Sequence, residues 1–137
     1  MTTHFINDNG YLLWQAANKW QRNLNKALKK HKLTHARFIL LSVAAQSAGQ
    51  SQKSLAAKAG IEKMMASKIL RTLEKNKLLN RKESKNDSRS ISIEITVNGK
   101  KLLAKAETDV KKVEAAFFKP LAKKQKNFNK KLKGLLA

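Results

Sequence analysis

Residues 51–79 read SQKSLAAKAGIEKMMASKILRTLEKNKLL, two short amphipathic segments that meet at Gly60. We predict a helix over residues 52–58, followed by a tight turn in which Gly60 tolerates a positive φ. A second helix is predicted over residues 62–76, because its apolar residues recur at the i, i+3, i+4, i+7 spacing of one buried face. Two helices joined by so short a turn form a helix-turn-helix unit. The apolar residues of the second helix are Ala66, Ile69, Leu70 and Leu73.

The other face of this second helix carries positive charge. Such a face fits the major groove of DNA, where cations meet phosphates and Lys or Arg donates to guanine. Two alternatives remain: the charged side chains form only a solvated face, and Met64 is either a mobile exposed residue or a contact for a thymine methyl group. The residues predicted to contact DNA here are Lys63, Met64, Ser67, Lys68 and Arg71, with Gln52 and Lys53 from the preceding helix.

Further along the chain, the apolar period changes from that of a helix to that of a strand. Residues 79–83 are the predicted first strand, and the polar, basic loop 84–89 joins it to a second strand, so that residues 79–97 form a hairpin. Lys85 in this loop joins the predicted DNA-contacting residues, and Thr96 is the predicted N-cap of the helix that follows. The alternating apolar residues of the second strand are Ile91, Ile93, Ile95 and Val97.

Long helices are predicted on both sides of this unit. Residues 7–31 carry an apolar stripe with steps of three and four residues, and residues 98–137 carry a similar stripe that Pro120 interrupts. Before the helix-turn-helix, a helix that begins near Thr34 is apolar on nearly all sides over residues 38–45, as at the centre of a core. The stripes are Leu13, Ala17, Trp20, Leu24 and either Ala27 or Leu28 in the first long helix and Leu103, Ala106, Val110, Val113 and Phe117 in the second.

The 137 residues are predicted to form one domain, mostly helical with a small β wing. Residues 34–97 make the winged helix-turn-helix, including the wing hairpin. Residues 7–31 and 98–137 make the dimerisation helices. Within the latter, residues 121–136 form a basic amphipathic helix, for which contact with an anionic membrane surface is the alternative. Burial in a dimer is favoured by the apolar side chains of Phe128, Leu132 and Leu135.

The order of these elements resembles the MarR family of bacterial transcription regulators over roughly residues 10–118. The resemblance is strongest in residues 51–61, 64–79 and 86–99. A helix-turn-helix alone is weak evidence, but here it is linked in order to two further family features. These are the Asp-x-Arg wing signature, present as Asp87-Ser88-Arg89, and the Thr-x-x-Gly that opens the next helix, present as Thr96 to Gly99.

The resemblance implies a homodimer in which the N- and C-terminal helices of both subunits interlock and two recognition helices meet a pseudo-palindromic operator in double-stranded DNA. By the motif match, residues 62–76 are the recognition helix, Arg89 at the wing tip enters the minor groove, and Asp87 stabilises the wing. Glu62 replaces the family's usual Ser, Thr or Asp cap, and Ala66 is smaller than the usual Val. Family members often have an effector cavity between the dimer helices and the DNA-binding lobe, and its predicted lining here is Tyr11, Trp14, His35 and Phe38. The alternative for the aromatic residues is that they make core or dimer contacts.

The composition limits the classes of protein further. There are 30 Lys or Arg against 9 Asp or Glu, a net charge of +21, and no Cys, which excludes disulfides and thiolate metal sites. The longest apolar run is far too short for a membrane span, and no signal peptide is visible, so a cytoplasmic, nucleoid-associated protein is predicted. The charge does not locate the site: residues 51–98 hold a net +6 and the other 89 residues the remaining +15. A Lys bias from AT-rich coding DNA is an alternative source of the net positive charge.

We therefore predict a sequence-specific transcription regulator, a ligand-responsive repressor that acts as a homodimer. The alternatives are a sequence-tolerant DNA-coating protein without an effector, and a protein-interaction or membrane-surface module. No phosphate loop or nucleophile elbow occurs, so no enzyme activity and no cofactor are predicted. His31 and His35 have a spacing that can bind a metal on a helix, but a helix junction separates them, and no metal is predicted.

Overall fold

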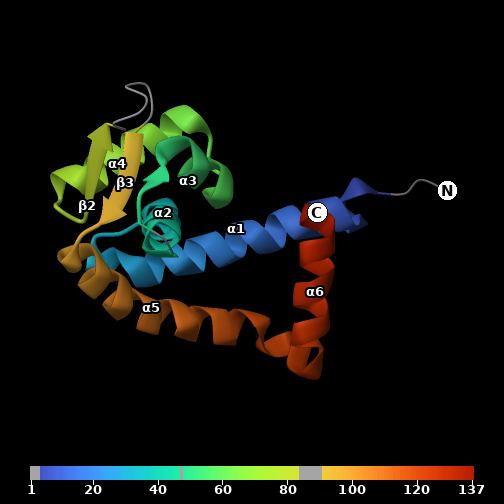
Figure 1. The fold of residues 1–137 in the computed structure, drawn as a ribbon. Helices are drawn as coiled ribbons and strands as arrows, with labels where there is room; N and C mark the ends of the chain where they lie inside the picture. Colours follow the sequence, from blue (N-terminus) through green and yellow to red (C-terminus); the bar gives the residue numbers. More distant parts are fainter. Residues whose placement is uncertain (1–3, 47, 84–90) are drawn as a thin grey trace.

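The computed structural model describes residues 4–46, 48–83 and 91–137. A lobe made of α2, α3, α4 and the sheet sits at one end of the two long helices α1 and α5, and α6 stands at the other end of α5 (Figure 1). The α-helices are α1 Asn9–Leu28, α2 His35–Gln46, α3 Gln52–Ala59, α4 Lys63–Lys75, α5 Val97–Phe118 and α6 Gln125–Leu136. The strands are β1 Gln50–Ser51, β2 Leu79–Glu83 and β3 Ile91–Ile95, and the 3-10 helices are η1 Phe5–Asn7, η2 Lys29–His31 and η3 Lys119–Lys124.

The core of the lobe is built around α2, whose nearly all-apolar sequence predicted this position. Leu40 and Leu41 of α2 are fully buried, and α2 contacts α3, α4, β3 and α5. The sheet is antiparallel in the order β1-β3-β2, which places Ile93 of β3 in the middle of the sheet and at zero exposure. The other buried residues of the lobe are Ala44, Leu55, Ala56, Ala66, Leu70, Leu73 and Leu79.

Most predicted helices are confirmed, and two predicted N-caps are present in atomic detail. The side chain of Thr34 accepts a hydrogen bond from the N–H of Arg37 at 3.2 Å, and that of Thr96 accepts one from Gly99 at 3.0 Å. Each cap satisfies a backbone N–H that has no partner within its own helix. The mostly helical architecture with a small sheet is therefore the predicted one.

Three details of the prediction were wrong. The predicted sheet was a two-stranded hairpin, but Gln50 and Ser51 form a third short strand, β1, which pairs with Ile93 and Ser92 of β3. Val97 begins α5 and does not end the strand. The last helix begins at Gln125, four residues later than predicted, because the chain passes through η3, where Ala122 has a non-helical backbone with φ 49°.

The long helices α1 and α5 are joined by polar contacts as well as by apolar packing. Trp20 of α1 donates its ring N–H to Oε1 of Glu114 in α5 at 2.7 Å. Asp109 of α5 lies 2.6 Å from Nε2 of His31 and 3.1 Å from Nζ of Lys30. The hydrogen bond from His31, and after it that from Lys30, holds the pKa of Asp109 below its ordinary value. The carboxylate is therefore charged near neutral pH and fixes η2, which directly follows α1, to the middle of α5.

The lobe is attached to α5 through a close backbone contact. The N–H of Thr96 donates to the carbonyl oxygen of Leu78 at 3.1 Å, and the Thr96 hydroxyl donates to the carbonyl of Lys77 at 2.8 Å. Gly99, in the first turn of α5, is buried directly against the carbonyl oxygen of Leu78. A Cβ on Gly99 would clash with the Leu78 oxygen and lie 2.7 Å from Cγ1 of Ile95. Only glycine allows the helix and the strand to approach so closely.

We predict that Gly99→Ala lowers the free energy of unfolding by about 1–3 kcal/mol, because the new methyl group forces the backbone of Leu78 to move. Urea denaturation of purified protein measures this change. Gly134→Ala in α6 is the matched control, since a Cβ there meets nothing within 4 Å. An equal loss in both variants, or none in Gly99→Ala, contradicts the close contact.

Candidate DNA interface

The outer face of α4 gathers the predicted recognition residues on one surface. Lys63, Lys68 and Arg71 are exposed, Met64 is 80% exposed and Ser67 is half-buried. The opposite face of the same helix carries Ala66, Leu70 and Leu73, all at zero exposure. A helix held by its apolar side, with a projecting basic side, has the shape and charge that fit a DNA major groove.

The start of α4 is fixed by an unusual cap. Glu62 takes the N-cap position, and its two carboxylate oxygens accept hydrogen bonds from the N–H groups of Met64 at 2.9 Å and Met65 at 3.1 Å. These bonds, that from Met64 first, lower the pKa of Glu62 below its ordinary value. The longer Glu side chain therefore caps the helix as the Ser, Thr or Asp usual at this position would, and it places a negative charge at the positive end of the helix dipole.

The turn between α3 and α4 has the predicted geometry. Gly60 has a φ of 67°, in the left-handed region where an L side chain is strained. The N–H of Ile61 donates to the carbonyl of Ala56 at 3.0 Å, which closes the end of α3. The start of α3 is capped by Ser51, whose hydroxyl accepts from Ser54 at 3.0 Å. The angle between the two helices is therefore set by local backbone bonds.

The two α3 residues predicted to contact DNA differ in their surroundings. Lys53 is exposed. Gln52 is half-buried, and its Oε1 is buried with no hydrogen-bond partner in the described part of the chain. Both remain predictions.

The wing is described only at its base. β2 and β3 pair from Leu79↔Ile95 to Glu83↔Ile91. Lys85, Asp87 and Arg89, the predicted DNA-contacting and wing-stabilising residues, lie outside the described residues and stay predictions.

A contact that the sequence did not reveal ties the wing to α4. Glu74 of α4 accepts from the N–H of Arg81 in β2 at 3.2 Å, and its other oxygen lies 3.8 Å from Nη1 of the same Arg81. With 3.8 Å between the charges and the Glu74 side chain 41% exposed, the ion pair contributes little, but the backbone hydrogen bond aligns β2 with α4. No spacing rule links the two positions, because the turn at residues 76–78 sets their distance.

The predicted effector residues lie in two places on this chain. Tyr11 and Trp14, in the first turns of α1, have ring centroids 6.3 Å apart, and Trp14 is 60% exposed. His35 of α2 makes an edge contact with Trp20 at 5.1 Å, and burial lowers its pKa. Phe38 packs against the core. Among the described residues, no ring contact joins Tyr11 and Trp14 to His35 and Phe38.

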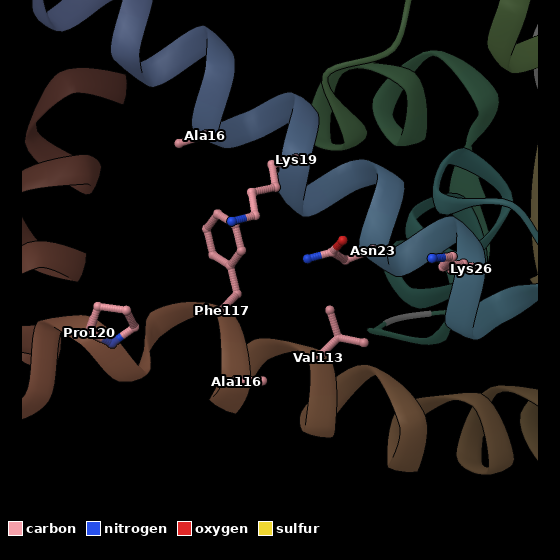
Figure 2. Close-up of a pocket in the computed structure, with 8 residues that line it drawn as sticks. All are labelled: Ala16, Lys19, Asn23, Lys26, Val113, Ala116, Phe117 and Pro120. Atoms are coloured by element: carbon pink, nitrogen blue, oxygen red, sulfur yellow. The ribbon is translucent and has the colours of Figure 1, made fainter.

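A groove of about 610 Å³ lies between α1 and α5 (Figure 2). None of the four predicted effector residues lines it. Its walls combine lysines and apolar side chains: Ala16, Lys19, Asn23 and Lys26 from α1, Val113, Ala116 and Phe117 from α5, and Pro120.

The two histidines considered as metal ligands have other neighbours. His31 contacts Asp109, and the ring of His35 faces Trp20. In the described ranges, no three His, Cys, Asp or Glu side chains come together as a metal site. Within the same ranges no helix is long and apolar enough to cross a membrane.

The capped basic helix, the Gly60 turn and the paired wing strands define a winged helix-turn-helix protein. Residues 33–91 match the MarR family. The HTH-type transcriptional regulator YdcH of Bacillus subtilis is 37% identical over 93% of this chain and 88% of its own length. The chain therefore belongs to the MarR family and is a transcriptional regulator.

Other relatives are known with bound partners. The HTH-type transcriptional repressor Rv2887 of Mycobacterium tuberculosis is 30% identical over 92% of this chain and 91% of its own. Its structure in complex with salicylic acid covers 95% of this chain and 96% of that one, with a TM-score of 0.73. The repressor CouR bound to a 23-mer DNA duplex is 22% identical, covers 98% of this chain and 99% of its own, and has a TM-score of 0.84.

We predict that Glu62→Ala loosens the first turn of α4 and lowers the melting temperature near neutral pH. The pKa of Glu62 is lowered in the folded protein, so its stabilising effect is full above the ordinary Glu pKa and is lost as pH falls through the lowered value. The difference in melting temperature between Glu62→Ala and the parent protein should therefore shrink on acidification from about pH 7 to about pH 3. Glu107→Ala on the exposed side of α5 is the control, and a difference independent of pH argues against the cap.

Proposed function

We propose that the protein is a ligand-responsive repressor that acts as a homodimer on a pseudo-palindromic operator. The observation that carries this proposal is the outer face of α4, where Lys63, Lys68 and Arg71 project from a helix whose other face is fully buried. The relatives support it: Rv2887 is named a repressor, and CouR is a repressor known in a DNA complex. Lys, Arg and Ser on such a face serve both phosphate and base contacts.

The homodimer is supported by apolar surface that one subunit leaves uncovered. Leu12, Leu13 and Trp14 of α1 are 51%, 50% and 60% exposed, and Leu135 and Leu136 of α6 are 73% and 87% exposed. Apolar groups gathered in this way on the long helices favour burial against another subunit. A dimer places two copies of α4 at a fixed distance, and about 34–36 Å is the separation that suits successive major grooves.

Control by an effector is supported by the relatives with bound aromatic ligands, salicylic acid in Rv2887 and the thioester p-coumaroyl-CoA in CouR. In this chain Trp20 links α1 to both α5 and α2, since it donates to Glu114 and touches His35. A ligand bound beside these helices changes the distance between the two α4 helices if it binds one dimer state more tightly. Tyr11, Trp14, His35 and Phe38 are the residues proposed to meet it, with the second subunit completing the pocket.

We predict that Lys68→Ala or Arg71→Ala weakens operator binding by about 1–3 kcal/mol and relaxes the sequence preference at one base position, if the side chain reads a base. The operator is first obtained by selection from a random DNA pool, and binding is then measured by fluorescence anisotropy. An equal loss on all sequences shows a phosphate contact instead. Lys75→Ala, in the last turn of α4, controls for removal of one charge.

The same selection separates the regulator from a sequence-tolerant coating protein. A specific regulator keeps a preference of about a thousandfold or more over random duplexes, whereas a coating protein has a steep salt dependence and almost none. A screen of small organic acids for release of the selected operator then tests the effector. If no sequence is enriched, the repressor proposal fails.

We predict that Arg89→Ala reduces operator affinity without changing the unfolding midpoint, because a wing-tip guanidinium inserted into a narrow minor groove contributes to binding and not to the fold. A gel-shift titration measures the affinity, and circular dichroism measures the unfolding. Asp87→Ala is expected to weaken binding through the wing. Unchanged affinity in Arg89→Ala shows that the wing assignment is wrong.

A further inference from the structure

The last part of the chain has an unusual concentration of positive charge. Glu114 is the last acidic residue, and the 23 residues after it contain seven lysines and no Asp or Glu. All seven lysines are exposed, and among the described residues none forms an ion pair. A Lys bias of the whole sequence explains many lysines, but it does not explain why every acid is missing here. The lysines are Lys119, Lys123, Lys124, Lys126, Lys130, Lys131 and Lys133.

Three of these lysines form a continuous stripe on α6. Lys126, Lys130 and Lys133 have the i, i+4, i+7 spacing that places side chains on one face of a helix. Like charges at this spacing repel one another and weaken the helix, unless an anion lies against them. We call these three residues the α6 lysine stripe.

The opposite face of α6 is used for packing within the subunit. Phe128 is half-buried with its ring 5.9 Å from that of Phe118, and Leu132 is half-buried beside Leu121. A helix that lies in a membrane surface needs its apolar face free to enter the acyl boundary. Here the middle of that face is covered by Phe118 and Leu121, and its exposed end, Leu135 and Leu136, is proposed above to be buried in the dimer, so the face left for a further partner is the charged one.

The position of α6 places the stripe far from the recognition surface. α5 has 22 residues, a length of about 33 Å at 1.5 Å per residue, and it separates the lobe from α6. β2 ends and β3 begins on the side of the lobe away from α5 (Figure 1). A duplex held by α4 and the wing therefore does not reach the stripe.

We propose that the α6 lysine stripe is a second binding surface for duplex DNA, so that one protein molecule holds two duplexes at once. A row of lysines without competing acids binds a polyanion through release of its counterions, with no need for a base sequence. Duplex DNA is the polyanion that the protein already meets through α4. Binding of the first duplex, by α4, rests on the proposed function; binding of the second duplex, by the stripe, does not.

A capture assay tests this inference on the full-length protein. One random-sequence duplex is immobilised and loaded with protein, and retention of a second, labelled random duplex is measured over a salt series. The parent protein should retain it. In the variant K126Q/K130Q/K133Q retention should fall at least tenfold at low salt, and the slope of log affinity against log salt should become shallower by about 3, near 0.9 for each lost phosphate contact.

Two matched variants isolate the stripe from charge in general. K126R/K130R/K133R keeps the charge and should keep the capture. K101Q/K105Q/K111Q removes three exposed lysines of α5, and it should capture the second duplex as the parent does. Circular dichroism confirms that each variant is folded. Equal losses in the α5 and α6 glutamine variants, or no loss in the α6 variant, overturn the proposal.

Two further measurements keep this inference separate from the proposed function. K68A/R71A should lose preference for the selected operator but retain stripe-dependent binding of a random duplex, whereas K126Q/K130Q/K133Q should keep the operator preference. Failure of the operator selection therefore leaves the capture result intact. Flotation with vesicles of phosphatidylcholine and phosphatidylglycerol examines the other polyanion, and stripe-dependent vesicle binding without duplex capture overturns the proposal.

Discussion

The packing of the inner face of α4 against α2 and α3 is the contact on which the recognition surface depends. Ala66, Leu70 and Leu73 are fully buried in it. Because this side supplies the helix with its stability, the outer side needs no contact within the subunit and is free to carry lysine, arginine and an exposed methionine. Each fully buried Leu contributes on the order of 1.5–3 kcal/mol, more than the repulsion among a few exposed lysines costs.

The orientation of the lobe relative to the long helices is also fixed by specific contacts. The backbone contact at Gly99 fixes where α5 leaves the sheet, and Asp109 and Glu114 then fix α5 against α1. A rotation of α5 must therefore move the lobe with it. A regulator that is controlled through its dimer helices needs such a coupling, since a flexible joint would leave the recognition helix unaffected by anything bound elsewhere.

The parts of the fold that the sequence predicted are those determined by neighbours along the chain. The α3 and α4 helices, the Gly60 turn and the Thr96 cap depend on spacing and on cap chemistry within a few residues. The contact of Glu74 with Arg81 and the pairing of β1 depend on segments that meet only in space. The irregular segment η3 contains Pro120 and the non-helical Ala122, and the apolar spacing does not show where the next helix begins. The Glu62 cap lies between these cases, because its position was predicted but its chemistry departs from the usual short side chain. For the site, the sequence predicted which residues share the outer face of α4, and their DNA contacts stay predictions.

The net charge of +21 did not locate a DNA site in the sequence, but the structure shows how the charge is distributed over two surfaces. On α4, three cations project beside a capped helix end, in a geometry that can distinguish bases. On α6, lysines without acidic partners form a stripe, a geometry that follows a backbone but reads no sequence. The two proposals therefore give specific and non-specific binding separate origins in this chain. A protein with both surfaces gains overall affinity for DNA-rich surroundings. Because the stripe is proposed to hold a separate duplex, the base preference of α4 for its own duplex does not change.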